Sequence, residues 1–486
     1  MRKSGILMPI FSLPSPYGIG TFGTAAYKFV DYLKSAGQTY WQILPLGPTS
    51  YGDSPYQTFS SFAGNPYFID LDKICYEGLL SLEEIAEYSK NDDTVDYEFL
   101  YNNRFKLLKI AFSRFKADEN YSNFCLENSF WLDEYAVFMT LKNLHNDRPT
   151  DEWKEKYRRC SAELIDAVKK EHTDSVNFYK FLQYKFMGQW LELKSYANEN
   201  GIKIIGDIPI YVAFDSADVW GSPEQFLLDE NLMPVSVAGC PPDAFSSTGQ
   251  LWGNPLYDWE KMAEDDYAWW KNRLKWSFKM YNIVRIDHFR GFEAFYSIPF
   301  GSATAETGSW IKGPGVKFFN SLEEELGDMP VIAEDLGFLT DGVREMLKES
   351  GFPGMKVLQF AFDTREESDY LPHNYTKNCV VYTGTHDNNT VLGWVDEVTE
   401  PIVLHAQNYL ASSREGLADA MMRAALGSVA DTCILMMPDI LSKGEDGRIN
   451  VPSTLGGNWV WRMSRQEFDM LQGNRLYELT HLYGRI

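Results

Sequence analysis

The chain has 486 residues, of which 44% are hydrophobic, so it can bury a large core. Its formal net charge of −23 disfavours binding to nucleic acids and to anionic membranes. Aromatic residues make up 15% of the chain, and they can fill a core or stack on sugar rings. The composition favours a globular protein that acts on a neutral substrate.

The six cysteines are far apart in the sequence, and no C-x-x-C pair occurs. This spacing predicts free thiols, and neither a disulfide framework nor a zinc site. Pro9 interrupts the first apolar run and no small-residue cleavage site follows it, so we expect no secretory signal. No apolar run approaches the ~20 residues of a membrane helix. We therefore expect a cytoplasmic protein, either a monomer or a homodimer.

Near the N-terminus, residues 18–23 read G-I-G-T-F-G and match the dinucleotide-binding pattern G-x-G-x-x-G. The segment before them contains two prolines and does not read as a strand, so the pattern lacks the strand that it needs. We interpret it as a loop that leads into a helix, with Thr24 as its cap and Gly37 at its end.

Eight apolar segments are predicted as β-strands, and helical segments separate most of them. The strands are expected at residues 39–46, 65–71, 202–208, 282–287, 330–334, 354–360, 379–383 and 432–436. This alternation predicts an α/β fold, specifically a single catalytic (β/α)8 TIM barrel over residues 1–486. We expect no separate C-terminal β domain.

Two long segments interrupt the predicted barrel. Residues 72–200 carry aromatic residues at helical spacing, such as Phe105 and Phe112, and they are too many for a loop. We expect them to form a helical insertion subdomain. Residues 209–280 are dense in Trp, Pro and Gly, and they predict a second, loop-rich insertion.

Charged side chains stand at the ends of four predicted strands. They are Asp207; Arg285, Asp287 and His288; Glu334 and Asp335; and His386 and Asp387. Barrel enzymes place their catalytic residues at the carboxyl ends of the strands, where these side chains would meet. Arg285 and Asp287 share one face of a strand because side chains alternate. A neighbouring cation keeps a carboxylate ionised.

This constellation leaves three chemical interpretations open. The Arg285–Asp287 pair could be a structural ion pair. Asp and His side chains could ligate a metal, although only His288 and His386 are near the mouth and no H-x-H pair occurs. Paired carboxylates can instead cleave a glycosidic bond without a metal. Aromatic residues in loops rich in Gly and Pro favour sugars, and these are Tyr51, Tyr56, Phe59, Phe245, Trp252 and Tyr257.

Seven motifs follow one another along the whole chain. They are W-Q-I-L-P-L-G-P-T-S-Y-G-D-S-P-Y-Q (41–57), G-D-I-P-I-Y-V-A (206–213), P-P-D-A-F-S-S-T-G-Q-L-W-G-N-P (241–255), V-R-I-D-H-F-R-G (284–291), I-A-E-D-L-G (332–337), T-G-T-H-D-N-N-T (383–390) and L-G-G-N-W (455–459). In this order the chain resembles the 4-α-glucanotransferases, or amylomaltases, of glycoside hydrolase family 77 in the α-amylase clan. Unlike ordinary amylases, it has His288 directly after Asp287 and no obvious calcium loop.

The resemblance implies transfer of α-1,4-glucan segments between maltooligosaccharides, which serve as donor and acceptor, with no cofactor and no metal. It implies Asp287 as nucleophile, Glu334 as general acid and base, and Asp387 as the group that holds the ring hydroxyls. The substrate-binding residues that it implies are Arg285, His288, His386, Tyr56, Asp243, Gln250, Trp252, Asp207 and Asn458.

Transfer requires that water be kept away from the covalent intermediate, and the apolar residues of 241–257 predict a lid over the cleft. The nearest alternative is an α-glucan hydrolase of the same clan. A metal-dependent barrel hydrolase is a more distant one. A catalytically inactive sugar-binding protein is disfavoured because Asp287, Glu334 and Asp387 are all present.

Overall fold

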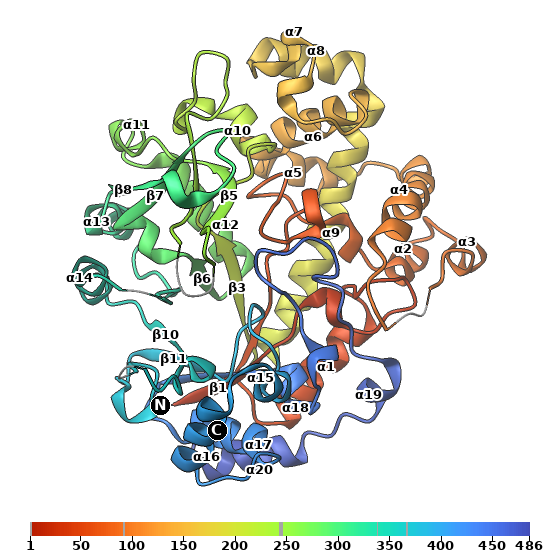
Figure 1. Ribbon diagram of the computed structural model, residues 1–486. Coiled ribbons are helices and arrows are strands. Elements are labelled where there is room, and N and C mark those ends of the chain that lie inside the picture. The colour runs from red at the N-terminus through yellow and green to blue at the C-terminus, as the bar shows by residue number, and fades with distance from the viewer. Residues whose placement is uncertain (1, 91–92, 243–245, 338, 366–367) are drawn as a thin grey trace.

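The computed structural model describes residues 2–90, 93–242, 246–337, 339–365 and 368–486. Eight parallel strands form a nearly closed barrel in the order β10-β11-β12-β1-β2-β3-β6-β9 (Figure 1). They are β1 (Lys3–Leu7), β2 (Tyr40–Gln42), β3 (Lys203–Pro209), β6 (Ile283–Asp287), β9 (Val331–Ala333), β10 (Gly354–Val357), β11 (Cys379–Tyr382) and β12 (Thr432–Met436). The Ala333 N–H donates to the Pro353 carbonyl at 3.0 Å, which brings β9 against β10. The predicted TIM barrel is confirmed.

One predicted strand of the barrel is wrong, and one real strand of the barrel was missed. Residues 65–71 form a short 3-10 turn and the start of α2 (Leu71–Tyr76). Asn65 and Asp70 cap these two elements, each accepting a backbone N–H, and such caps favour helical turns over a strand. The missing strand is β1, which pairs with β2 on one side and β12 on the other.

A run of helices connects β2 to β3. After α1 (Thr24–Ser35), which precedes β2, come α2, α3 (Leu82–Ala86), α4 (Tyr97–Arg114), α5 (Glu119–Glu127), α6 (Ser129–Leu144), α7 (Glu155–Arg158), α8 (Ala162–Glu171) and α9 (Thr173–Glu199). Figure 1 shows α6, α7 and α8 far from the strands, whereas the long α9 runs down beside the barrel. The Trp190 indole on α9 is fully buried and donates to the Met280 carbonyl at 3.1 Å. Helix α9 therefore belongs to the wall of the barrel.

A second sheet stands beside the barrel, and the sequence patterns did not predict it. It is antiparallel, in the order β5-β4-β7-β8, with β4 (Ser236–Cys240), β5 (Gln250–Pro255), β7 (Ala294–Pro299) and β8 (Ser309–Lys312). Helices α10 (Ala217–Gly221), α11 (Trp259–Glu264) and α12 (Ala268–Met280) accompany it. Its strands come from before and after β6, so the sheet borders the end of that strand (Figure 1).

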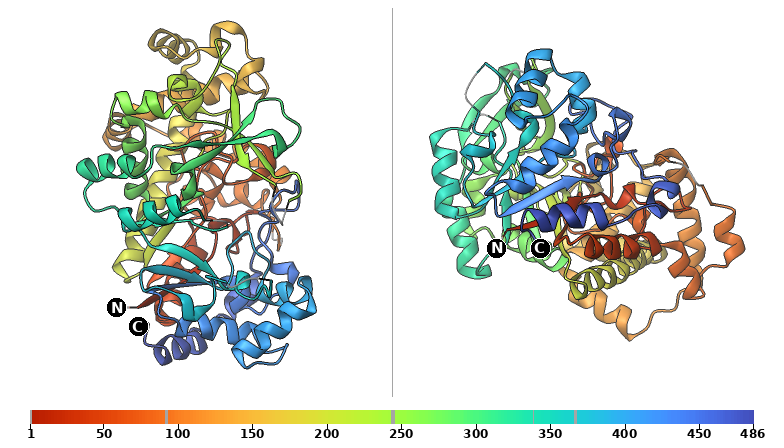
Figure 2. Two further views of the ribbon diagram at one scale, coloured as in Figure 1. Left: turned by 60° about the vertical axis from the view of Figure 1, so that its left-hand side comes forward. Right: turned by 90° about the horizontal axis from the view of Figure 1, so that it is seen from below.

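The second half of the chain completes the outer layer of helices. These are α13 (Val316–Leu326), α14 (Asp341–Ser350), α15 (Val391–Glu397), α16 (Glu400–Leu410), α17 (Leu417–Gly427), α18 (Met437–Ile440), α19 (Arg465–Asp469) and α20 (Asn474–Leu482). The two termini lie close together (Figure 2), and the buried Arg485 donates to the Lys3 carbonyl at 3.0 Å. Among the described residues, no helix combines the length and apolarity that crossing a membrane requires.

Two glycines allow a matched test of the packing around β3. A Cβ at Gly206 would overlap the buried ring of Tyr281, whereas a Cβ at the exposed Gly188 on α9 meets nothing within 4 Å. We expect Gly206→Ala to destabilise the fold by about 1–3 kcal/mol through overpacking. Gly188→Ala should stabilise it by about 0.5–1 kcal/mol because alanine favours the helix. Circular dichroism melting curves measure both; equal midpoints would contradict this account.

Candidate active site

Three acidic side chains meet at the carboxyl ends of the barrel strands. Asp287 is the last residue of β6, Glu334 directly follows β9, and Asp387 lies in the loop after β11. The His288 N–H donates to Glu334 Oε2 at 2.7 Å, so the ends of β6 and β9 are in direct contact. The side chains of Asp287 and Asp387 are 31% and 42% exposed, which leaves both open to a ligand.

Arg285 is the cation around which the site is built. Its Nη1 donates to both oxygens of Asp207, at 2.8 and 2.7 Å, and its Nη2 lies 2.9 Å from Asp287 Oδ1. The guanidinium is only 3% exposed, so these charge-assisted bonds form away from water and fix its orientation. The predicted ion pair is present, and Asp207 shares it.

Asp207 and Tyr56 form the support behind this cation. The Asp207 side chain is 0% exposed and accepts a hydrogen bond from the Tyr56 hydroxyl at 2.8 Å. Because both of its oxygens are engaged and none reaches solvent, the structure favours a positioning role for Asp207 over the predicted contact with substrate. The Tyr56 ring stacks on His386 with centroids 5.2 Å apart, next to Trp459.

The two carboxyls at the ends of β6 and β9 have different environments. Burial and the charge of Asp287 raise the pKa of Glu334 to about 7, and Arg285 opposes this only in part. Burial also raises the pKa of Asp287, but Arg285 favours its ionised form. Such a difference sets up an acid beside a carboxylate, which is the arrangement that general acid catalysis requires.

Asp387 remains ionised down to low pH. Burial by itself would raise its pKa, but His386, with Nε2 3.3 Å from Asp387 Oδ2, and the amide of Asn450 keep it at about 2. The Asn450 Nδ2 donates to Asp387 Oδ1 at 2.6 Å. In turn, burial lowers the pKa of His386, but Asp387 raises it more, so it is above its usual value.

His288 forms one wall of the site with the second sheet. Its backbone is left-handed (φ 54°), and the Trp252 ring on β5 meets it edge to face at 4.8 Å. The Trp252 indole donates to Gln250 Oε1 at 3.0 Å. Burial lowers the pKa of His288 to about 3, so the imidazole is neutral. Its Nε2 is buried and has no hydrogen-bond partner among the described residues.

The remaining predicted residues have different outcomes. Asn458 bonds within its own loop, accepting from the Val451 N–H at 2.9 Å and donating to Thr454. Asp335, the other acid after β9, is buried and accepts from the Met355 N–H at 2.6 Å, so it holds β10 and does not line the mouth. Asp243 lies outside the described residues.

Sequence reasoning missed two residues of the site. Asn450 and Trp459 contact Asp387 and His386 from the loop that follows α18. Neither follows a barrel strand; the nearby motif at 455–459 was the one signal pointing to this loop.

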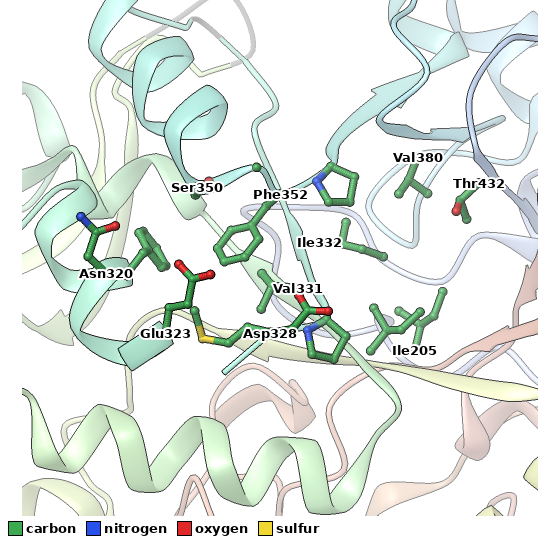
Figure 3. A pocket seen from close by; sticks show the side chains of 16 residues that line it. Ile205, Asn320, Glu323, Asp328, Val331, Ile332, Ser350, Phe352, Val380 and Thr432 are labelled. Carbon is green, nitrogen blue, oxygen red and sulfur yellow. The ribbon is translucent and has the colours of Figure 1, made fainter. Parts of the chain in front are cut away.

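A cavity of about 300 Å³ opens at the opposite end of the barrel (Figure 3). It is lined by first residues of strands, such as Val331 and Thr432, so it is remote from the three acids. Among the described residues, no group of three or more His, Cys, Asp or Glu side chains is placed to hold a metal ion.

The pKa of Glu334 can be tested without reference to turnover. We expect its carboxyl to titrate near pH 7 in ¹³C NMR spectra, with the signal assigned by Glu334→Gln. In Asp287→Asn the midpoint should fall, because one negative charge that raises it is gone, yet remain above 4.5 because burial persists. The exposed Asp174→Asn serves as control and should leave it unchanged. A midpoint near 4.5 in the unsubstituted protein would contradict the burial argument.

Comparison with known proteins agrees with this geometry. A family model described as 4-alpha-glucanotransferase matches residues 8–467. A 4-alpha-glucanotransferase of Clostridium butyricum is 51% identical, over 98% of this chain and 100% of that protein. One from Streptococcus pneumoniae is 48% identical, over 100% of this chain and 98% of that protein.

Solved structures agree as well. The amylomaltase from Streptococcus agalactiae, determined in complex with acarbose, superposes with a TM-score of 0.96 at 42% identity, and the match covers both chains completely. The motif resemblance is thus confirmed over the full length of the molecule. The chain belongs to the 4-alpha-glucanotransferase family.

Proposed function

We propose that the protein transfers α-1,4-linked glucan segments between maltooligosaccharides through a covalent intermediate on Asp287. The observation that carries this mechanism is the pair of carboxyls at the ends of β6 and β9. Asp287 is held by Arg285 at 2.9 Å, and Glu334 has a pKa of about 7. One ionised and one protonated carboxyl are what a retaining glycosidic displacement needs.

In the first step, an Asp287 oxygen attacks the anomeric carbon of the donor glucan. The bond from that carbon to the leaving 4-oxygen breaks, and Glu334 gives its proton to this oxygen. The product is a glucosyl ester of Asp287, now neutral, together with a shortened glucan. Asp207 remains bound to Arg285 throughout and keeps the guanidinium of Arg285 in place.

In the second step, the 4-hydroxyl of an acceptor glucan gives its proton to Glu334 and attacks the anomeric carbon. The ester bond to Asp287 breaks, and both carboxyls return to their starting states. Asp387 accepts hydrogen bonds from the ring hydroxyls during both steps. Its ionised state, maintained by His386 and Asn450, makes it a strong acceptor of hydrogen bonds from hydroxyls.

Tyr56, His288, His386, Gln250 and Trp252 line the proposed sugar site. The neutral Nε2 of His288, which has no hydrogen-bond partner among the described residues, suits a hydroxyl. Asn458 orders the loop that carries Asn450, and we assign the contact with Asp387 to Asn450 itself. Asp243 stays a predicted substrate contact.

Transfer in place of hydrolysis depends on excluding water from the ester. The contact of Trp252 with His288 supports the proposal that residues 241–257 cover the cleft. A hydrolase of the same clan is not favoured.

We further propose that residues 72–200 and 209–280 be treated as additions to a single barrel, apart from α9 and α12, which pack on its wall. Cysteines that are far apart in the sequence support a cytoplasmic location, and we retain a monomer or a homodimer as the working form.

Incubation with maltotriose tests the proposed function. Transfer gives glucose and a ladder of longer chains while the total of reducing ends stays constant. Asp287→Ala should reduce the rate by several orders of magnitude, since the nucleophile is removed. Chromatography and a reducing-end assay measure both effects. A steady rise in reducing ends would make the protein a hydrolase, and near-normal turnover of Asp287→Ala would refute the covalent mechanism.

Asn450→Ala tests the support of Asp387. Removal of a hydrogen bond to a charged group costs about 1.5–3 kcal/mol, so we expect kcat/KM on maltotriose to fall roughly 10- to 100-fold. Val451→Ala, at an exposed position next to it, is the matched control and should keep full activity. If the two variants behave alike, the 2.6 Å contact does not serve catalysis.

A further inference from the structure

A second hollow lies outside the cleft, between α6, α10, α12 and the loop that follows Tyr56. Its volume is about 150 Å³, below the roughly 300–1,000 Å³ of pockets for larger ligands, so it suits one ring and not a chain. Its lining combines aromatic rings with carboxyls, chiefly Phe62, Phe130, Trp131, Trp269, Glu134 and Asp218.

Phe62 is the centre of the aromatic wall. Its ring is 5.6 Å from Phe130, 6.4 Å from Trp131 and 6.3 Å from Trp269. Phe130 is 53% exposed, which is unusual for a ring that belongs to such a cluster. The cluster therefore presents a rigid apolar surface to anything that enters the hollow.

Two carboxyls lie beside the rings. Asp218 is buried, accepts from the Ser61 N–H at 2.7 Å, and has a pKa raised to about 6 by burial. Glu134 has no hydrogen-bond or ion-pair partner among the described residues, and a Cβ at Gly221 would overlap its carboxyl. Burial, together with Asp218 and Glu224, raises the pKa of Glu134 to about 8. At neutral pH the Glu134 carboxyl is thus mostly protonated.

Trp131, one of the residues that line the hollow, also carries an unused donor. The indole Nε1–H of Trp131 is buried and meets no acceptor among the described residues. A buried donor without a partner costs free energy, and a ligand oxygen would remove that cost. Donors on Trp131 and protonated Glu134, next to an acceptor on Asp218, match hydroxyl groups, which both donate and accept.

The hollow and the three acids lie at the same end of the barrel. Helix α12 runs antiparallel to β6, which follows it, so Trp269 near its start is at the carboxyl end of the strands. Phe62 follows Tyr56 by six residues in the same loop. The Ala217 N–H, at the start of α10, bonds to the Phe59 carbonyl at 2.8 Å, which fixes this loop against α10.

We propose that this hollow binds a single glucosyl unit of an α-glucan outside the cleft, with the sugar ring on Phe62 and Phe130 and its hydroxyls on Glu134, Asp218 and Trp131. The choice of an α-glucan rests on the proposed function. Such a site holds a long chain near the three acids while another part of it reacts, and it leaves short substrates unaffected. A small organic cation is the competing ligand for rings beside carboxyls, but the unpaired Trp131 donor and the proton on Glu134 oppose it.

Affinity electrophoresis in native gels that contain amylopectin tests the site, with all proteins carrying Asp287→Asn to prevent turnover. Phe130→Ala removes the exposed ring, and Glu134→Leu removes the carboxyl at similar volume. We expect each to weaken retardation by about three- to tenfold, the scale of one ring contact. Leu144→Ala, a 48% exposed apolar residue on the same helix, is the matched control and should not change it.

The two variants, with Asp287 restored, should keep normal maltotriose disproportionation. If Phe130→Ala and Glu134→Leu are retarded as much as the control, the proposal is overturned. It is also overturned if tetramethylammonium, but not maltose, protects the Trp fluorescence from a soluble quencher. Because the gel assay needs no turnover, the outcomes are separable. If the variants lose retardation but the unsubstituted protein shows no transferase activity, the glucan site stands and the proposed function is refuted. If the unsubstituted protein transfers glucan but the variants keep full retardation, the proposed function stands and the site is refuted.

Discussion

The active site depends on one buried cation that two carboxylates share. Arg285 holds Asp207 with one nitrogen and Asp287 with another, and Tyr56 completes the set by bonding to Asp207. A buried guanidinium is costly unless it is paired, so the fold itself requires both acids. That requirement fixes the ends of β3 and β6 relative to each other. In the proposed mechanism, the attacking oxygen of Asp287 is the one that Arg285 does not hold.

The electrostatic asymmetry of the site follows from this arrangement. Asp287 is paired with Arg285, and Asp387 with His386 and Asn450, whereas the hydrogen bonds that Glu334 accepts from described residues come from two backbone N–H groups, of His288 and Leu336. Burial and the charge of Asp287 therefore raise the pKa of Glu334, and Arg285 and these two N–H groups oppose them only in part. In the proposed mechanism, three side chains of one chemical kind, all carboxyls, act as acid, nucleophile and hydroxyl acceptor because their surroundings differ.

Sequence patterns predicted most of the barrel and the three acids because strand ends carry a strong signal: a short apolar run that stops at charge. They failed where the structure depends on contacts between residues that are far apart in the sequence. Residues 65–71 have strand composition but are capped as turns, and the apolar run of β1 is interrupted at once by Pro9. Asn450 follows no strand, and only the folded loop brings it to Asp387. The second sheet pairs strands that precede β6 with strands that follow it, and such pairing is not visible in the local sequence pattern.

The position of β1 has a consequence for how the chain folds. Lys3 pairs in register with Thr432, and Arg485 bonds back to Lys3, so the first strand cannot obtain its second neighbour until the last eighth of the chain exists. During synthesis, the growing sheet has an open edge on β1 until β12 has been made. Contacts of such long sequence separation are slow to form, and unpaired edges invite aggregation. Strand β12 thus provides the closing step of folding, and the barrel is completed only after residues 432–436 have been synthesised.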